Sequence, residues 1–241
     1  MKQSAERAAT KVARNIVQDI QTKSLSPGTK LDAEHVMIDR QGVSRATVRE
    51  ALRLLEFQGA LRIKAGPGGG PVVNVPDINH LTSGLSLQLQ FANATFRSVL
   101  EARKSIYPVL VEEAAVNATH QDIAALRQAL SKIQAAIADT RSAVLETRHF
   151  YELIAVASKN LVLGFMLNAL HRMSEPTRIK FDASQWRASL KDAGRILDAI
   201  ERGDAEAARE VSTTAMNAAM RYQEKTASDL LSEPVSWITA E

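Results

Sequence analysis

The chain has 241 residues, of which 45% are hydrophobic and 24% charged, an ordinary globular composition that excludes a chain disordered throughout. At about 150 residues per domain, the length allows one large domain or two smaller ones. Cysteine is absent, which excludes disulfides, thiolate zinc sites and cysteine nucleophiles. No apolar run approaches the roughly 20 residues that span a bilayer, and the first ten residues lack the apolar core of a secretory signal. We therefore expect a cytoplasmic protein without a membrane segment.

Charge is unevenly distributed along the chain. Residues 1–75 contain 12 Lys and Arg against 7 Asp and Glu, a net charge of +5. Residues 76–241 contain 18 against 20, a net charge of −2. A basic first third on a mildly acidic remainder indicates that one segment meets a polyanion. An imbalance that arose by chance is the alternative, and charge alone does not separate the two.

The first 75 residues follow the order of a winged helix-turn-helix. Apolar residues recur at helical spacing in three stretches, and β-forming residues flank a glycine-rich run. The pattern predicts helices over 10–22, 33–40 and 45–58, a turn over 24–31, and two strands over 61–64 and 72–75. Three helices followed by a hairpin in about 70 residues are typical of this DNA-binding fold.

The rest of the chain predicts an all-α bundle, so the fold class as a whole is mainly α. Residues 76–95 favour a linker and a connecting helix, and residues 225–241 resemble a tail. Between them, helical periodicity is nearly continuous and no strand pattern occurs. The predicted helices cover residues 96–117, 120–138, 141–157, 161–173, 184–202 and 204–224, which makes a bundle of six or seven helices.

The third predicted helix carries a basic face. Arg45 and Arg49 are four residues apart, with Thr47 between them and Arg53 one turn further. In a helix-turn-helix, the first turns of this helix enter the major groove, where Arg can donate two hydrogen bonds to guanine. A solvated surface face is the alternative, but this face begins a helix, follows a glycine turn and lies opposite an apolar stripe.

The run AGPGGGP at residues 65–71 forms the predicted tip of the hairpin. No Gly-Lys-Ser/Thr follows and no helix begins there, which excludes a phosphate-binding loop and a dinucleotide fingerprint. Glycines such as Gly66, Gly68 and Gly69 allow positive φ and let the backbone approach phosphates or the minor groove. A flexible tip without contacts is the alternative.

Residues 27–73 resemble the DNA-binding domain of the GntR family of bacterial transcription regulators. The resemblance implies that Arg45, Thr47 and Arg49 contact an operator and that the glycines form the wing tip. We add Glu34, Ser44 and Arg53 to the predicted DNA-binding residues because they lie in the matching motifs. These motifs are Pro27-Gly28-Thr29-Lys30-Leu31, Glu34, Gly42-Val43-Ser44-Arg45-Ala46-Thr47-Val48-Arg49-Glu50-Ala51-Leu52-Arg53, Leu55-Glu56 and Gly59.

The helical part resembles the FCD effector domain of the FadR-like branch of that family. The matching residues are Glu101-Ala102-Arg103, Phe150, residues 155–160 and residues 196–209. The resemblance implies four parts. They are a DNA-binding domain over residues 8–75, a linker over 76–95, an effector-binding and dimerisation domain over 96–224, and a tail over 225–241.

The residues at the expected metal site depart from the family pattern. Many FCD domains bind a divalent metal through an Asp and three His. By this resemblance the four positions fall on Thr147, Tyr151, Ala193 and Ala215, which do not supply carboxylate and imidazole ligands. His149 is the nearest histidine and lies on another face of its helix. We therefore expect no metal in the usual site and no other cofactor.

A ligand site without a metal is the remaining possibility for the helical domain. The resemblance matches Arg103 to a polar position of the effector site. Our hypothesis is that Arg103 and Tyr151, with Asn168 or Arg172, bind the acid group of an organic effector. The alternative is an internal salt bridge of Arg103 with Glu112 or Glu146, because a buried guanidinium needs a carboxylate.

Three functions are compatible with these patterns. The first is a dimeric repressor that binds a palindromic operator in double-stranded DNA and responds to a small organic acid. The second is a DNA-binding dimer whose helical domain only dimerises and binds no effector. The third is an enzyme with a DNA-binding domain, but no nucleophile elbow, HExxH motif or phosphate loop is present. We therefore predict a regulator, not an enzyme.

Overall fold

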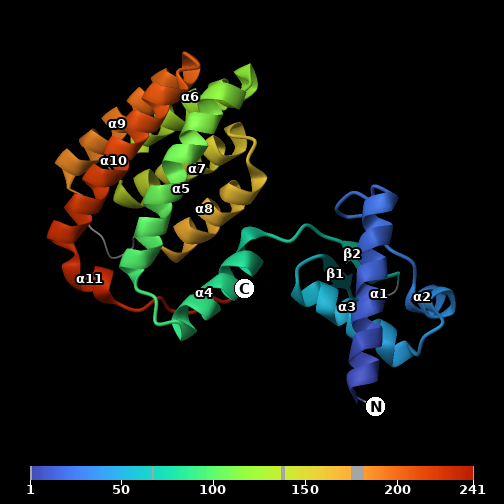
Figure 1. The fold of residues 1–241 in the computed structure, drawn as a ribbon. Helices are drawn as coiled ribbons and strands as arrows, with labels where there is room; N and C mark the ends of the chain where they lie inside the picture. The colour runs from blue at the N-terminus through green and yellow to red at the C-terminus, as the bar shows by residue number, and fades with distance from the viewer. Residues whose placement is uncertain (1, 67, 137–138, 175–181, 241) are drawn as a thin grey trace. The chain divides into compact units, whose positions relative to one another are not determined.

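The computed structural model describes residues 2–66, 68–136, 139–174 and 182–240, and the chain divides into two compact units. Met1–His80 form the first unit and Leu81–Glu241 the second. Figure 1 shows the first unit from blue to cyan and the second from green to red. Among the described residues, no helix combines the length and apolarity required to cross a membrane.

The first unit contains the three predicted helices, α1 (Lys2–Thr22), α2 (Glu34–Gln41) and α3 (Arg45–Phe57). Their apolar faces meet in one core that includes Ile16, Met37 and Leu52. Helix α1 begins earlier than the predicted residue 10. The first residues lack an apolar stripe, but they are rich in Ala, Glu, Lys and Arg, which favour helix by propensity alone.

The wing is a hairpin of β1 (Leu61–Lys64) and β2 (Gly70–Val73), with Leu61 opposite Val73. The predicted second strand, 72–75, was two residues late. The four residues of β1 pair with residues 70–73, and the next residue, Asn74, donates its backbone N–H to the carbonyl of Ala60, which precedes β1. The predicted turn over 24–31 is also only partly correct. Its end, around Lys30, forms a β-bridge with Val72 and adds a third short segment to the hairpin.

In the described part of the second unit, the regular elements are all helices, and Thr95 forms an isolated β-bridge with Pro234. Six long helices form the bundle, as predicted, and α5 packs against α7, α8, α9 and α10 (Figure 1). Their shared core includes Leu110, Leu126, Ile154 and Ile200, which lie on different helices. The helices are α4 (Ile78–Phe91), α5 (Phe96–Asn117), α6 (His120–Ala136), α7 (Thr140–Ala157), α8 (Leu161–Met173), α9 (Ala183–Glu201), α10 (Ala205–Thr226) and α11 (Ser228–Ser232). Residues 137 and 138, in the predicted helix 120–138, lie outside the described part.

The C-terminal segment is not the tail that the sequence suggested. After α11, residues 234–238 run along α4 and are bound to it by specific hydrogen bonds. The backbone N–H of Trp237 donates to Gln90 at 2.7 Å, and that of Ile238 donates to the hydroxyl of Ser86 at 3.0 Å. Val235 is buried in a cluster with residues of α4, α5 and α8. One apolar residue and backbone hydrogen bonds carry no periodic signal, so the pattern missed this contact.

We expect Val235→Asp to destabilise the helical unit, because it places a carboxylate in a cluster of apolar side chains. A loss of about 2 kcal/mol or more should lower its melting temperature by roughly 5–10 °C. Ser236→Asp adds the same charge to an exposed position of the same segment and is the matched control. Equal melting temperatures for the two variants in calorimetry would show that the segment does not contribute to the fold.

Candidate functional site

Helix α3 presents an exposed basic face in the first unit. Ser44 caps the helix by accepting a hydrogen bond from the backbone N–H of Thr47 at 3.2 Å, and its own hydroxyl lies 2.9 Å from that of Thr47. Within the described part of the chain, Arg45 and Arg53 are exposed and form no ion pair. Arg49 is exposed and pairs with Glu34 of α2 at 3.0 Å, so Glu34 orients this arginine.

The glycines of the wing are required by the backbone conformation. Gly66 and Gly68 have φ of 91° and 76°, which side-chain-bearing residues rarely adopt. Gly69 has ordinary φ, but a Cβ there would lie 2.2 Å from the carbonyl oxygen of Lys64. The ammonium of Lys30 donates to the carbonyl of Gly68 at 2.6 Å and braces the tip. The wing is therefore a defined turn that exposes backbone and basic residues.

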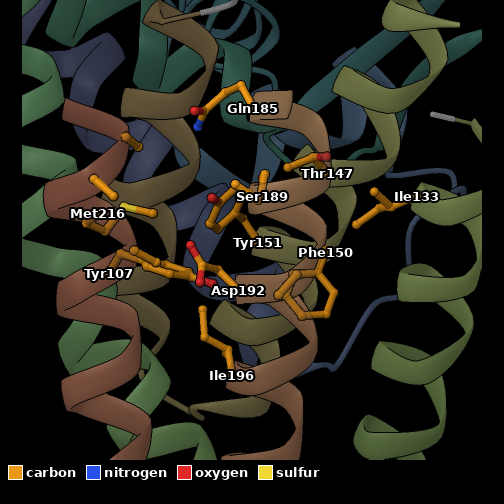
Figure 2. A pocket seen from close by; sticks show the side chains of 15 residues that line it. Tyr107, Ile133, Thr147, Phe150, Tyr151, Gln185, Ser189, Asp192, Ile196 and Met216 are labelled. Atoms are coloured by element: carbon orange, nitrogen blue, oxygen red, sulfur yellow. The ribbon is translucent and has the colours of Figure 1, made fainter. Parts of the chain in front are cut away.

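The second unit contains a partly open cavity of about 80 Å³ between α5, α6, α7, α9 and α10. Thr147, Tyr151, Ala193 and Ala215, the four positions that the resemblance assigns to metal ligands, all line it. Figure 2 shows Thr147, Phe150 and Tyr151 from α7 facing Ser189, Asp192 and Ile196 from α9. The predicted register is therefore consistent with one common site.

The side chains around this cavity do not fit a divalent metal. Among the described residues that line it, Asp192 is the only acidic one and none is a histidine. Across the described residues, no three His, Cys, Asp or Glu side chains lie close enough to share an ion. One carboxylate with Tyr and Thr hydroxyls is a poor ligand set for zinc, which prefers nitrogen and sulfur, and for Mg²⁺ or Ca²⁺, which need more oxygen ligands.

The predicted effector residues are only partly brought together. Tyr151 lines the cavity, whereas Arg103, Asn168 and Arg172 are not in its lining. Arg103 donates from Nη1 to the hydroxyl of Ser174 at 2.8 Å, and its Nε is buried without a partner among the described residues. No described carboxylate pairs with it. Of the two alternatives, Glu112 pairs instead with Arg209, and Glu146 forms no described ion pair with Arg103.

A buried aromatic cluster connects Arg103 to the cavity. The rings of Tyr107 and Tyr151 lie 4.6 Å apart edge to face, and the ring of His171 lies 4.8 Å from Tyr151. Burial raises the pKa of both tyrosines, so both phenols are neutral at physiological pH. Burial lowers the pKa of Arg103 to about 10, which leaves it charged. Burial, together with Arg103 and Arg148, lowers the pKa of His171 well below its usual value, so it is neutral.

Both parts of the chain match known families. Residues 8–70 match the bacterial regulatory proteins of the gntR family, and residues 98–218 match the FCD domain. The Uxu operon transcriptional regulator of Escherichia coli K12 is 30% identical over 222 residues, covering 86% of this chain and 82% of its own. The chain belongs to the GntR family. It is a DNA-binding transcription regulator with an FCD domain, and its relatives are regulators, not enzymes, as the sequence predicted.

Other comparisons agree with this GntR assignment. The Uxu operon regulator of Haemophilus influenzae is 26% identical over 222 residues, covering 87% of this chain and 79% of its own. Among solved structures, Streptococcus agalactiae GntR aligns with a TM-score of 0.68 at 20% identity, over 88% of this chain and 99% of that one. At this identity the structural match supports the fold alone.

Several residues of the GntR regulator escaped the sequence analysis. Asp192 lines the cavity and directly precedes Ala193, a position that the family resemblance assigned to the site. This neighbourhood in the sequence could have identified it. Tyr107 lies one helical turn after Arg103 on α5. His171 directly precedes Arg172, a predicted effector residue, but its burial beside Tyr151 depends on the tertiary structure. Lys30 lies in the matched Pro-Gly-Thr-Lys-Leu motif, but its contact with the wing tip depends on the tertiary structure.

We expect Arg45→Ala to reduce the affinity of this GntR regulator for DNA about 10- to 100-fold, the usual effect of removing one arginine contact to a base. The measurement is fluorescence anisotropy on a duplex selected by the purified protein from a random library. Arg187→Ala removes an equally exposed arginine of α9 and should leave the affinity unchanged. Equal affinities of the two variants would contradict the assigned role of Arg45.

We expect His171 to make the helical unit less stable as the pH falls. The unfolded chain protonates this residue below about pH 6.5, whereas the folded unit keeps it neutral, so acid favours the unfolded state. His171→Phe keeps a ring beside Tyr151 and should reduce the stability lost between pH 7 and pH 5 by up to about 2 kcal/mol in urea unfolding. His149→Phe, at a half-exposed position, is the control. The interpretation fails if both variants lose as much stability between pH 7 and pH 5 as the parent protein.

Proposed function

We propose that this regulator is a dimeric repressor whose affinity for a palindromic operator is modulated by a small organic acid bound in the helical domain. The observation that carries the effector part is the cavity with buried, unpartnered polar atoms. A DNA-binding unit joined to a domain with such a cavity has the two sites that a ligand-controlled regulator requires. Two relatives are regulators of the Uxu operon, which is in keeping with this function.

The DNA-binding part of the proposal is supported by exposed cations on a capped helix. Arg45 and Arg53 have no described ion partner, so binding DNA breaks no internal ion pair at these positions. Arg49 is held by Glu34 and needs little ordering. The wing adds Arg62 and exposed backbone for phosphates. Binding through phosphates releases counterions, so the affinity should fall steeply with salt.

The effector part is supported by hydroxyls that lack partners. The hydroxyl of Tyr107 and that of Thr147 are buried beside the cavity, and no described group bonds to either. Buried polar atoms without partners cost about 1–3 kcal/mol each and are uncommon. A ligand that accepts hydrogen bonds would satisfy them, and the positive charge of Arg103 near both tyrosines favours an acid.

The dimer part is supported by an exposed apolar surface on α8. Leu161, Val162 and Phe165 are 72%, 68% and 56% exposed and follow one another around the start of this helix, and Val156 at the end of α7 is 59% exposed. Large apolar residues that cluster at a surface mark sites of association. A two-fold dimer formed in this way would present two winged helices to the two halves of a palindrome.

We expect the protein to be a dimer in light scattering, and Phe165→Asp to shift it to monomer and weaken operator binding at least tenfold. Leu145→Asp, which changes an exposed leucine of α7, is the matched control and should remain dimeric.

Screening organic acids by thermal shift should find one that stabilises the protein and releases the operator. A monomeric parent protein would contradict the dimer, and a dimer that no acid stabilises or releases would support the effector-independent alternative.

A further inference from the structure

We propose that the cavity of the helical domain binds a small zwitterionic amino acid in place of a metal-bound acid. The carboxylate of Asp192 receives the ammonium group of the ligand, and the hydroxyls of Tyr107 and Thr147 donate to its carboxylate. This inference rests on the proposed function, since it specifies which kind of organic acid the domain recognises.

The negative end of the cavity is Asp192. Its side chain is only 28% exposed and lies close enough to Tyr151 to contribute to the raised pKa of that phenol. Figure 2 shows it beside Tyr107 and Tyr151. No described residue donates a hydrogen bond to this carboxylate. Its one described ion pair, with Arg195 on the same helix, spans 3.7 Å. The carboxylate therefore has capacity for a further donor on the cavity side.

The donors of the cavity are two hydroxyls that have no described partner. Tyr107 is only 1% exposed, and its hydroxyl has no described hydrogen-bond partner. The hydroxyl of Thr147 also has no described partner. Arg103 interacts electrostatically with Tyr107 and Tyr151, and no described carboxylate neutralises it. Two donors backed by a positive charge suit a carboxylate. The lining of the cavity thus contains one carboxylate acceptor, Asp192, and two hydroxyl donors without described partners.

A ligand with only an acid group fits this cavity less well. It would satisfy the hydroxyls, but it would bring its own charge close to Asp192 and leave that carboxylate without a donor, which is unfavourable at a partly buried site. An ammonium group removes both penalties, and the rings of Tyr107, Tyr151 and Phe150 can contact it through cation–π interactions.

The size of the cavity limits the ligand further. An apolar cavity of about 150 Å³ holds benzene, whereas this one measures about 80 Å³. Only a few non-hydrogen atoms fit without rearrangement. The smallest amino acids meet the polarity and need the least widening of this cavity, whereas longer or branched ones need more.

Isothermal titration of the full-length protein tests the proposal with matched probes. The amino acids are glycine, L-alanine, β-alanine and γ-aminobutyrate, and the acids without an amine are acetate, propionate and butyrate. We expect at least one amino acid to bind at least tenfold more tightly than its matched acid. Asp192→Asn should abolish that preference, whereas Asp198→Asn, an exposed aspartate of the same helix, should keep it.

Tyr107→Phe separates a ligand contact from a role in folding. Removing a buried hydroxyl without a partner should leave the melting temperature of the ligand-free protein unchanged or higher. The same variant should lower the affinity for the amino acid at least tenfold. Loss of stability without loss of affinity would contradict the proposed donor.

The outcomes distinguish this inference from the proposed function. Equal binding of acids and amino acids, with no effect of Asp192→Asn, overturns the inference and leaves an acid-responsive regulator. Tighter binding of Zn²⁺ than of any amino acid also overturns it. If no amino acid binds, the inference fails. If, in addition, no organic acid of a wider panel binds while the dimer still holds its operator, the effector part of the proposed function fails as well.

Discussion

The helical domain depends on a buried positive charge. The guanidinium of Arg103 has no described carboxylate partner and is held by the hydroxyl of Ser174 at 2.8 Å. Ser174 donates in turn to the carbonyl of Leu170 at 2.7 Å, so the arginine fixes the last turn of α8. Leu170 packs with Val235 and Leu85 in one apolar cluster. The charge of Arg103, which lies near the tyrosines of the cavity, therefore also supports the end of α8, where α4 and the C-terminal segment meet.

This arrangement places the cavity and α4 in one contiguous set of contacts. The boundary between the two units falls inside α4, between His80 and Leu81, and the wing precedes this helix by a few residues. A ligand that engages the donors near Arg103 acts on the same cluster that holds α4. Contiguity alone does not couple two sites, because a ligand changes operator affinity only if it binds two arrangements of the protein unequally.

The sequence predicted elements whose cause is local and missed those whose cause is not. Helix α3 follows from Gly42, the cap Ser44 and an apolar stripe, all within a few residues. The six long helices of the bundle follow from periodicity in the same way. The β-bridge of Lys30 exists because β2 lies beside it, and residues 234–238 take their shape from α4. Pairings between distant segments leave no local pattern to detect.

The same limit applies to the residues that line the cavity of the helical domain. The resemblance placed Thr147, Tyr151, Ala193 and Ala215 at equivalent positions, and all four line one cavity. Asp192 was missed because its orientation depends on how α9 is rotated in the bundle. A bound metal attracts carboxylate ligands through charge, whereas a site built from hydroxyls and one carboxylate requires matching donors and acceptors, and leaves buried groups unpaired when the ligand lacks them. Recognition in a cavity whose lining supplies hydroxyls and one carboxylate therefore depends strongly on the functional groups of the ligand.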